Sequence, residues 1–164
     1  MRQAATLTIP IATKTWSEAG ECCHSCEPKN DQKNCGFIID AVAARLRGTN
    51  AKAVAKTGLD GSWAEIEDRF NTKIGWGKSI DDAYGAAKSA GDGAMAIVGI
   101  KYSNNAGSHV VIIANDHGKV GIVEGQNWKP GQNAGVIYDA KAANLRYNSD
   151  GKSEIGVGVI PRDK

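Results

Sequence analysis

The sequence predicts an α+β domain in which one mostly buried helix packs on an antiparallel β-sheet. Between Phe37 and Leu46 the apolar residues leave almost no polar face, which is typical of a helix buried on most sides. After Gly93 the pattern changes to short β-branched runs, which are separated by the turn signals NNAG and DHGK. Helices that come first and strands that follow as an antiparallel meander indicate the α+β class.

The chain of 164 residues fits a single domain, 1–164, because domains commonly hold ~100–200 residues. Residues 1–33 are polar and irregular, so we expect mostly loop there, with a short helix near Trp16. The net charge of +2, without a basic stripe and interleaved aromatic residues, predicts no nucleic-acid partner. No run approaches the ~20 apolar residues of a membrane span, and the N-terminal stretch makes a poor signal peptide, so we expect neither.

Capping residues mark where the later helices start. Ser62 followed by Glu65 predicts a capping box that opens the helix WAEIEDRF. Ser79 with Asp82 predicts a similar start for IDDAYGAAKSA. The strands that we expect are GAMAIVGIK, SHVVIIAN, VGIVEG, GVIYD and IGVGVI.

Cys35 stands where a reactive thiolate would be stabilised. Asn34 is a good N-cap residue, so it would place Cys35 in the first turn of the buried helix, which Gly48 would end. Unpaired backbone N–H groups and the positive end of the helix dipole favour an anion at this position. Thiols in such positions have pKa values lowered from ~8.5 to roughly 3.5–7.5. Cys35 is therefore the candidate nucleophile, and an inert buried cysteine is the alternative.

A thiolate nucleophile needs a base, and the base needs an orienting group. His109 begins the apolar run HVVII, where an idle polar ring would be costly, so it is the candidate base. Any even loop length before the next strand puts Glu124 and Gln126 on the face of His109, because side chains alternate with a period of two. Asn127 falls on the other face unless a bulge intervenes. Glu124 is therefore the expected orienting residue, with Gln126 and Asn127 as reserves.

Two registers are compatible with the turn signal DHGK. A two-residue turn at 117–118 pairs Val111 with Glu124, whereas a turn at 116–117 sets His109 directly opposite Glu124. In both registers the acid and the histidine share one face. A cysteine at a helix N-terminus that faces a histidine and an acid on adjacent strands is the papain-like arrangement.

The stretch NCGFIIDAVAARL resembles the nucleophile helix of the small NlpC/P60-like, papain-fold amidase effectors of the bacterial type VI secretion system. In that family the motif usually reads Asn/Asp-Cys-Ser-Gly-Phe, whereas here Gly36 follows Cys35 directly and the serine is absent. The similarity continues through TNAKA, GLDGSW and AAKSAGDGAMAIVGIK to GSHVVII, and covers roughly residues 30–115. The resemblance implies a cysteine amidase that cuts the peptide stems of bacterial cell wall, with Cys35 as nucleophile and His109 as general base.

The resemblance also implies how the protein would be used. A secretion machinery would inject it into target bacteria without a signal peptide, it would act as an antibacterial toxin in the target periplasm, and the producing cell would hold a cognate immunity protein. The Cys35 backbone N–H is one expected oxyanion donor, and Gln32 or Asn30 upstream is another. The supporting residues that we consider are Gln32, Asn34, Gln126 and Asn127.

A second resemblance leads to a different substrate. The segments RLRGTNAKA and GSHVVIIANDHGKVGIVEGQ are similar to papain-fold toxin domains that cleave or deamidate proteins in the target-cell cytoplasm. An acid–Gly–Gln element supplies the third catalytic residue there, and it maps onto Glu124. A non-enzymatic binding module or an inactive homologue, in which the cysteine and the histidine merely pack, is the remaining class.

The other cysteines lie in the cluster CCHSC, namely Cys22, Cys23 and Cys26. A structural zinc ion usually needs a second pair of ligands farther along the chain, and none follows Cys35. We therefore expect no metal and no cofactor, and we interpret the cluster as thiols in a loop, with a disulfide within it left open. The tryptophans that could line a groove, or pack in the core or at its rim, are Trp63, Trp76 and Trp128.

Overall fold

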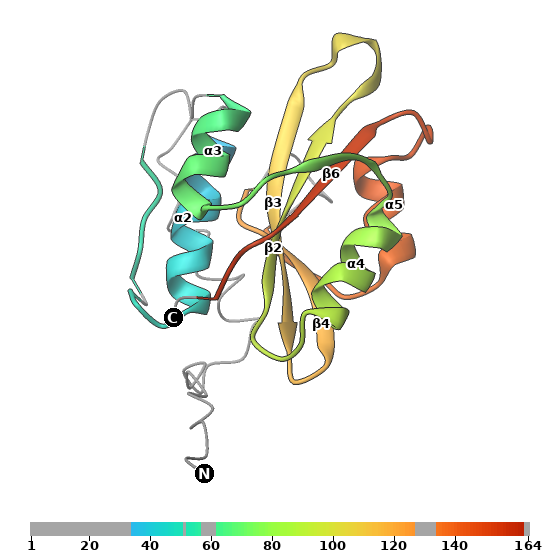
Figure 1. Cartoon of the computed structure of the whole chain (residues 1–164). Helices are drawn as coiled ribbons and strands as arrows, with labels where there is room; N and C mark the ends of the chain where they lie inside the picture. Colours follow the sequence, from blue (N-terminus) through green and yellow to red (C-terminus); the bar gives the residue numbers. More distant parts are fainter. Residues whose placement is uncertain (1–33, 51, 57–61, 127–133, 163–164) are drawn as a thin grey trace.

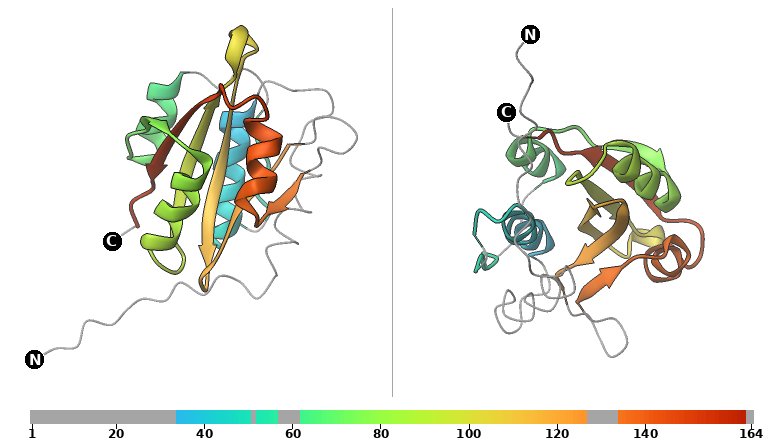
Figure 2. Two further views of the ribbon diagram at one scale, coloured as in Figure 1. Left: turned by 90° about the vertical axis from the view of Figure 1, so that its right-hand side faces the viewer. Right: turned by 90° about the horizontal axis from the view of Figure 1, so that it is seen from below.

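The computed structural model describes residues 34–50, 52–56, 62–126 and 134–162. These residues form three layers, in which helices cover both faces of one β-sheet (Figures 1 and 2). The helices are α2 (Cys35–Leu46), α3 (Trp63–Phe70), α4 (Ile80–Ser89) and α5 (Ala140–Tyr147), with a short 3₁₀ helix at Ser103–Asn105. The strands are β1 (Gly75–Lys78), β2 (Met95–Lys101), β3 (Ser108–Asp116), β4 (Lys119–Glu124), β5 (Gly135–Ile137) and β6 (Glu154–Val159).

The sheet is antiparallel and has the strand order β1-β6-β2-β3-β4-β5. The α+β class with an antiparallel sheet is therefore confirmed, and every expected strand is present. The expectation of helices first and a plain meander after them is wrong in two respects. Strand β1 precedes α4, and β6 returns from the C-terminal part of the chain to lie between β1 and β2. Helix α5 was not expected either.

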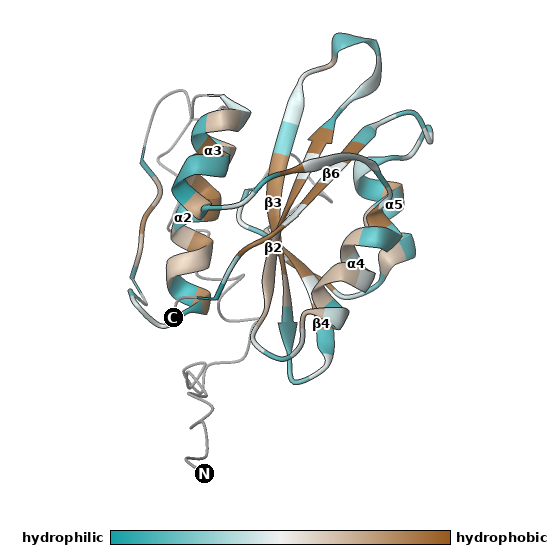
Figure 3. Ribbon diagram, in the orientation of Figure 1, coloured by the Kyte–Doolittle hydropathy of each residue, from teal (hydrophilic) through white to brown (hydrophobic). Residues whose placement is uncertain are grey.

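Two apolar cores lie on the two faces of the sheet, because side chains alternate along each strand. Helices α2 and α3 pack on the face that carries Ile97, Val110 and Ile112. Helices α4 and α5 pack on the opposite face, with Val111 and Ile113. The hydropathy colouring in Figure 3 shows the apolar colour along the central strands between the two helical layers. Helix α2 is buried on most sides, as its sequence predicts.

Both expected capping boxes are present. The Ser62 hydroxyl accepts from Glu65 N at the start of α3, and the Ser79 hydroxyl accepts from Asp82 N at the start of α4. Each acidic side chain also accepts from the backbone N–H of its serine. Local sequence therefore sets where these two helices begin.

Two tryptophans pack tightly on glycines of the sheet. The rings of Trp63 and Trp76 meet edge to face with centroids 4.9 Å apart, and both are half-buried against the α2-side core. A Cβ atom on Gly99 would lie 2.8 Å from Trp76, and one on Gly156 would lie equally close. These rings are thus packing elements at the rim of the core, whereas Trp128 lies outside the described residues.

The turn between β3 and β4 decides the register that the sequence left open. Asp116 pairs with Lys119, so the two-residue turn is His117–Gly118, and both residues have positive φ values, 52° and 89°. This geometry is that of a type I′ hairpin turn, for which glycine at the second position is favoured. The register along the hairpin pairs Ile112 with Val123, which directs Glu124 to the same face as Val111 and His109.

Candidate functional site

Helix α2 begins at Cys35, as expected, but Asn34 does not cap it with its side chain. The Asn34 carbonyl accepts from Phe37 N over 2.9 Å, which starts the helix. Its side-chain Nδ2 donates instead to the Lys56 carbonyl over 3.0 Å, and this interaction turns the amide away from the helix end. Cys35 is half-buried at the first helical position, where the backbone dipoles favour a thiolate.

Arg69 of helix α3 holds the first turns of α2 in place. Its Nη2 donates to the Gly36 carbonyl over 2.9 Å, and its Nε lies 3.0 Å from an Asp40 carboxylate oxygen. The guanidinium also lies over the Phe37 ring, 5.5 Å from the centroid. Burial raises the pKa of Asp40, and the Arg69 charge partly offsets this effect. The segment that carries Cys35 is therefore fixed from the side by a second helix.

His109 and Glu124 form a buried hydrogen-bonded pair. His109 Nε2 and Glu124 Oε2 are 2.8 Å apart, and each side chain is 1% exposed. His109 lies at the start of β3 and Glu124 at the end of β4, so hairpin pairing brings them together. The other carboxylate oxygen of Glu124 accepts from Gln126 N over 2.9 Å. The expectation that the acid and the histidine share one face is confirmed.

Helix α5 adds two residues that sequence analysis missed. The Tyr147 hydroxyl donates to Glu124 Oε2 over 2.7 Å, and its ring stacks on His109 with centroids 6.0 Å apart. Arg146 Nη2 lies 3.9 Å from the same carboxylate oxygen. The one local signal for this helix is Asp139, whose side chain accepts from Lys141 N as an N-cap.

The surroundings of Glu124 keep it charged. Burial acts to raise the pKa of Glu124, but the charge of His109, hydrogen bonds from His109 and Tyr147, and the charge of Arg146 outweigh burial and lower it. The pKa of Tyr147 is raised well above its ordinary value, first by burial and then by the Glu124 charge. At neutral pH the site therefore holds a carboxylate that accepts and a phenol that donates.

The partly buried Tyr102 packs against the core that contains Tyr147. Burial, the charge of Glu124 and, to a smaller extent, that of Cys35 raise the pKa of Tyr102 to about 12, against the effect of Arg146. Cys35 and Glu124 thus lie within electrostatic range of the same phenol. In Figures 1 and 2 the N-terminal end of α2 and the start of β3 lie at the same end of the sheet.

The two parts of the candidate site come from opposite faces of the sheet, with Cys35 on the α2 side and His109 on the face that carries Val111 and Tyr147. Cys35 packs with the α2-side core, whereas Tyr147 belongs to the core on the other side. Two of the expected supporting residues, Gln32 and Asn127, lie outside the described residues, as does Asn30, the alternative oxyanion donor. The chemistry that this arrangement allows is nucleophilic attack by a thiolate with a carboxylate-oriented imidazole as base.

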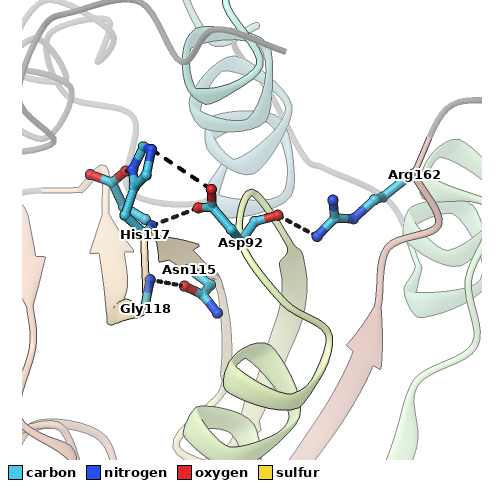
Figure 4. Close-up of polar contacts among 6 residues, drawn as sticks. Asp92, Asn115, His117, Gly118 and Arg162 are labelled. Atoms are coloured by element: carbon cyan, nitrogen blue, oxygen red, sulfur yellow. Dashed lines mark hydrogen bonds and ion pairs between the residues drawn. The ribbon is translucent and has the colours of Figure 1, made fainter. Parts of the chain in front are cut away.

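One group in the described ranges has the residue types and spacing for a metal ion, namely Asp92, Asp116 and His117. Its polar atoms already bind one another. His117 Nδ1 lies 2.7 Å from Asp116 Oδ1, and His117 N donates to Asp92 Oδ1 over 2.6 Å. Figure 4 shows the Asp92 side chain facing His117, while Arg162 reaches the Asp92 carbonyl. We interpret the group as a set of hydrogen bonds that stabilises the β3–β4 turn. The turn lies at the opposite end of these strands from His109 and Glu124.

The cluster CCHSC lies outside the described residues, so its role stays a prediction. Comparisons with protein-family models, with curated proteins and with solved structures find no match. Across residues 34–50, 52–56, 62–126 and 134–162, no helix is long and apolar enough to cross a membrane.

Proposed function

We propose that the protein is a papain-like cysteine amidase, a secreted antibacterial toxin that hydrolyses amide bonds in the peptide stems of peptidoglycan. The observation that supports this most is the buried pair of His109 and Glu124, 2.8 Å apart, at the end of the sheet where Cys35 begins α2. A buried imidazole oriented by a carboxylate is the group that a cysteine nucleophile requires.

The reaction would proceed in two halves. His109 takes the proton of the Cys35 thiol, and because its Nε2 binds Glu124, the proton moves through Nδ1. The thiolate attacks the carbonyl carbon of the amide, and the Cys35 backbone N–H stabilises the oxyanion. The tetrahedral intermediate collapses, the C–N bond breaks, and the imidazolium of His109 protonates the leaving amine. Water, deprotonated by His109, then hydrolyses the thioester to release the carboxylic acid and restore the thiol.

Glu124 orients the imidazole and stabilises its charged form. Tyr147 and Arg146 act one step farther away, because both hold the Glu124 carboxylate in place. Such supporting hydrogen bonds restrict the ring to one orientation and one tautomer, which is what a general base needs.

Peptidoglycan is proposed as the substrate because the resemblance of NCGFIIDAVAARL and the segments after it is to cell-wall amidase effectors. Under this proposal the secretion machinery delivers the protein to the target periplasm, and a cognate immunity protein protects the producer. Cleavage or deamidation of a protein in the recipient cytoplasm uses the same three residues, so it is treated as an outcome of the test.

The test expresses the chain in a susceptible bacterium, with and without an added export signal. We expect lysis only on export, and release of new amino groups when the purified protein digests isolated sacculi. Cys35→Ala should abolish both effects, whereas His117→Ala, at the exposed β3–β4 turn, should leave them unchanged. Growth arrest from the cytoplasm would identify a protein target instead. Toxicity that survives Cys35→Ala would show a binding module.

A further inference from the structure

Two buried amide side chains next to the candidate site have atoms with no hydrogen-bond partner among the described residues. These atoms are Nε2 and Oε1 of Gln126 and Oδ1 of Asn34. Gln126 is 1% exposed and Asn34 is fully buried. Asn34 directly precedes Cys35, and Gln126 follows Glu124 by two residues. Leaving a buried polar group unpaired is costly, so such groups are rare and require a physical explanation.

Asn115 shows how the same fold treats a buried amide with a structural role. It is 2% exposed, its Nδ2 donates to the Ala87 carbonyl over 3.1 Å, and its Oδ1 accepts from Gly118 N over 2.8 Å. Figure 4 shows the second of these bonds at the β3–β4 turn. The amide of Gln126 has the same chemistry and a similar degree of burial, yet neither of its side-chain polar atoms is used within the described fold.

The main chain of Gln126 is tied to the site. Its N–H donates to Glu124 Oε1 over 2.9 Å, while Oε2 of the same carboxylate binds His109. The group that orients the imidazole therefore also fixes the backbone of Gln126. Because the side chain is also only 1% exposed, the surrounding residues restrict its orientation before any ligand arrives, which reduces the entropy lost on binding.

We propose that the Gln126 carboxamide binds a peptide group of the substrate beside the scissile amide, with Nε2 donating to a carbonyl oxygen and Oε1 accepting from an N–H. The proposal rests on the amidase function above. A peptide group offers both a donor and an acceptor, so it can satisfy both unpaired atoms. A free carboxylate offers only acceptors and would lie near the negative charge of Glu124. The substrate at this position is therefore a neutral internal amide.

The experiment compares Gln126→Met, which keeps length and removes both polar atoms, with Asn115→Leu as the structural control. Gln126→Leu serves as a second apolar variant. Thermal unfolding and steady-state turnover of purified disaccharide-tetrapeptide fragments are measured for each. We expect kcat/KM to fall roughly tenfold to a hundredfold in both Gln126 variants, the equivalent of two neutral hydrogen bonds, while Tm stays level or rises. Asn115→Leu should lower Tm and leave KM unchanged.

The inference is overturned if both Gln126 variants keep kcat/KM within about twofold of wild type, or if activity falls only in parallel with Tm. Binding of the same fragments to Cys35→Ala, measured by calorimetry, separates this failure from that of the proposed function. If wild type turns over and Gln126→Met does not weaken binding in the Cys35→Ala background, the Gln126 role alone is wrong. If neither turnover nor binding occurs, the proposed function fails and the Gln126 role with it.

Discussion

Replacing Tyr147 with phenylalanine tests whether Glu124 is held as a carboxylate by its neighbours. The change keeps the ring that stacks on His109 and removes only the hydroxyl that donates to Glu124 over 2.7 Å. A hydrogen bond to a charged group contributes about 1.5–3 kcal/mol net. We expect Tyr147→Phe to lower the free energy of unfolding by ~2 kcal/mol at pH 7, which is roughly 4–8 °C in Tm for a chain of this size.

This loss should depend on pH, because Glu124 is the group that titrates. Its pKa in the folded protein is lowered from the ordinary 4.5, so the carboxylate stabilises the fold above pH 4.5. That contribution is lost as the pH falls through the lowered pKa, where the carboxyl group takes up a proton. The difference in the free energy of unfolding between Tyr147→Phe and wild type should therefore reach its full size above about pH 5 and become smaller below it.

Urea unfolding followed by circular dichroism, at pH 7 and at pH 3, measures this difference. Tyr84→Phe is the matched control, because the Tyr84 hydroxyl donates to the neutral carbonyl of Ile137 over 2.5 Å. Tyr84→Phe should lower the free energy of unfolding by ~1 kcal/mol, and by the same amount at both pH values. If Tyr147→Phe shows the same small and pH-independent loss as the control, Tyr147 does not hold Glu124 as a carboxylate, and the electrostatic description of the site is wrong.

His109→Ala should reduce turnover of peptidoglycan fragments nearly as much as Cys35→Ala, whereas Glu124→Ala should leave measurable activity, because an orienting residue contributes less than the nucleophile or the base. A larger loss in Glu124→Ala would contradict these roles. Iodoacetamide should label Cys35 below pH 8 faster than the thiols of CCHSC, as read by peptide mass mapping, and the opposite preference would reject Cys35 as nucleophile. Gly156→Ala should destabilise by ~1–3 kcal/mol, because its Cβ would lie 2.5 Å from a side-chain carbon. Gly85→Ala in α4, with nothing within 4 Å of its Cβ, should stabilise by ~0.5–1 kcal/mol, and equal effects in thermal unfolding would contradict the packing argument.

The elements that the sequence predicted are those whose signal is local. Helix α2 is apolar on almost every face, and the capping boxes at Ser62 and Ser79 need only residues three positions apart. Strand β1 escaped prediction because its four residues, GWGK, carry two glycines and no β-branched side chain. Helix α5 lacks a clear apolar stripe, because Leu145 is 67% exposed while only Ala143 and Tyr147 are buried, so its position depends on contacts that the sequence does not display.

In the candidate site, too, local sequence patterns predicted some features, whereas others depend on tertiary contacts. Alternation along two strands was sufficient to place Glu124 on the face of His109. The choice between the two registers depended on the turn, where Gly118 takes the second left-handed position of a type I′ geometry. The side chain of Asn34 could not be predicted, because its partner is the carbonyl of Lys56, which only the folded chain brings near. The tyrosine and arginine of α5 reach Glu124 by tertiary packing alone.

The hydrogen bonds around Glu124 support the proposed catalytic role of His109. Removing a carboxylate from water is costly, and replacing a buried ion pair with apolar residues of similar volume is often neutral or stabilising. The hydrogen bonds from His109, Tyr147 and the Gln126 backbone offset this cost, but apolar residues of similar volume could fill the same space without it. The arrangement instead gives an imidazole a fixed orientation and a neighbouring negative charge, and neither benefits packing. Both are what a base paired with Cys35 needs, so the energetic cost of the buried carboxylate favours catalysis over a passive fold.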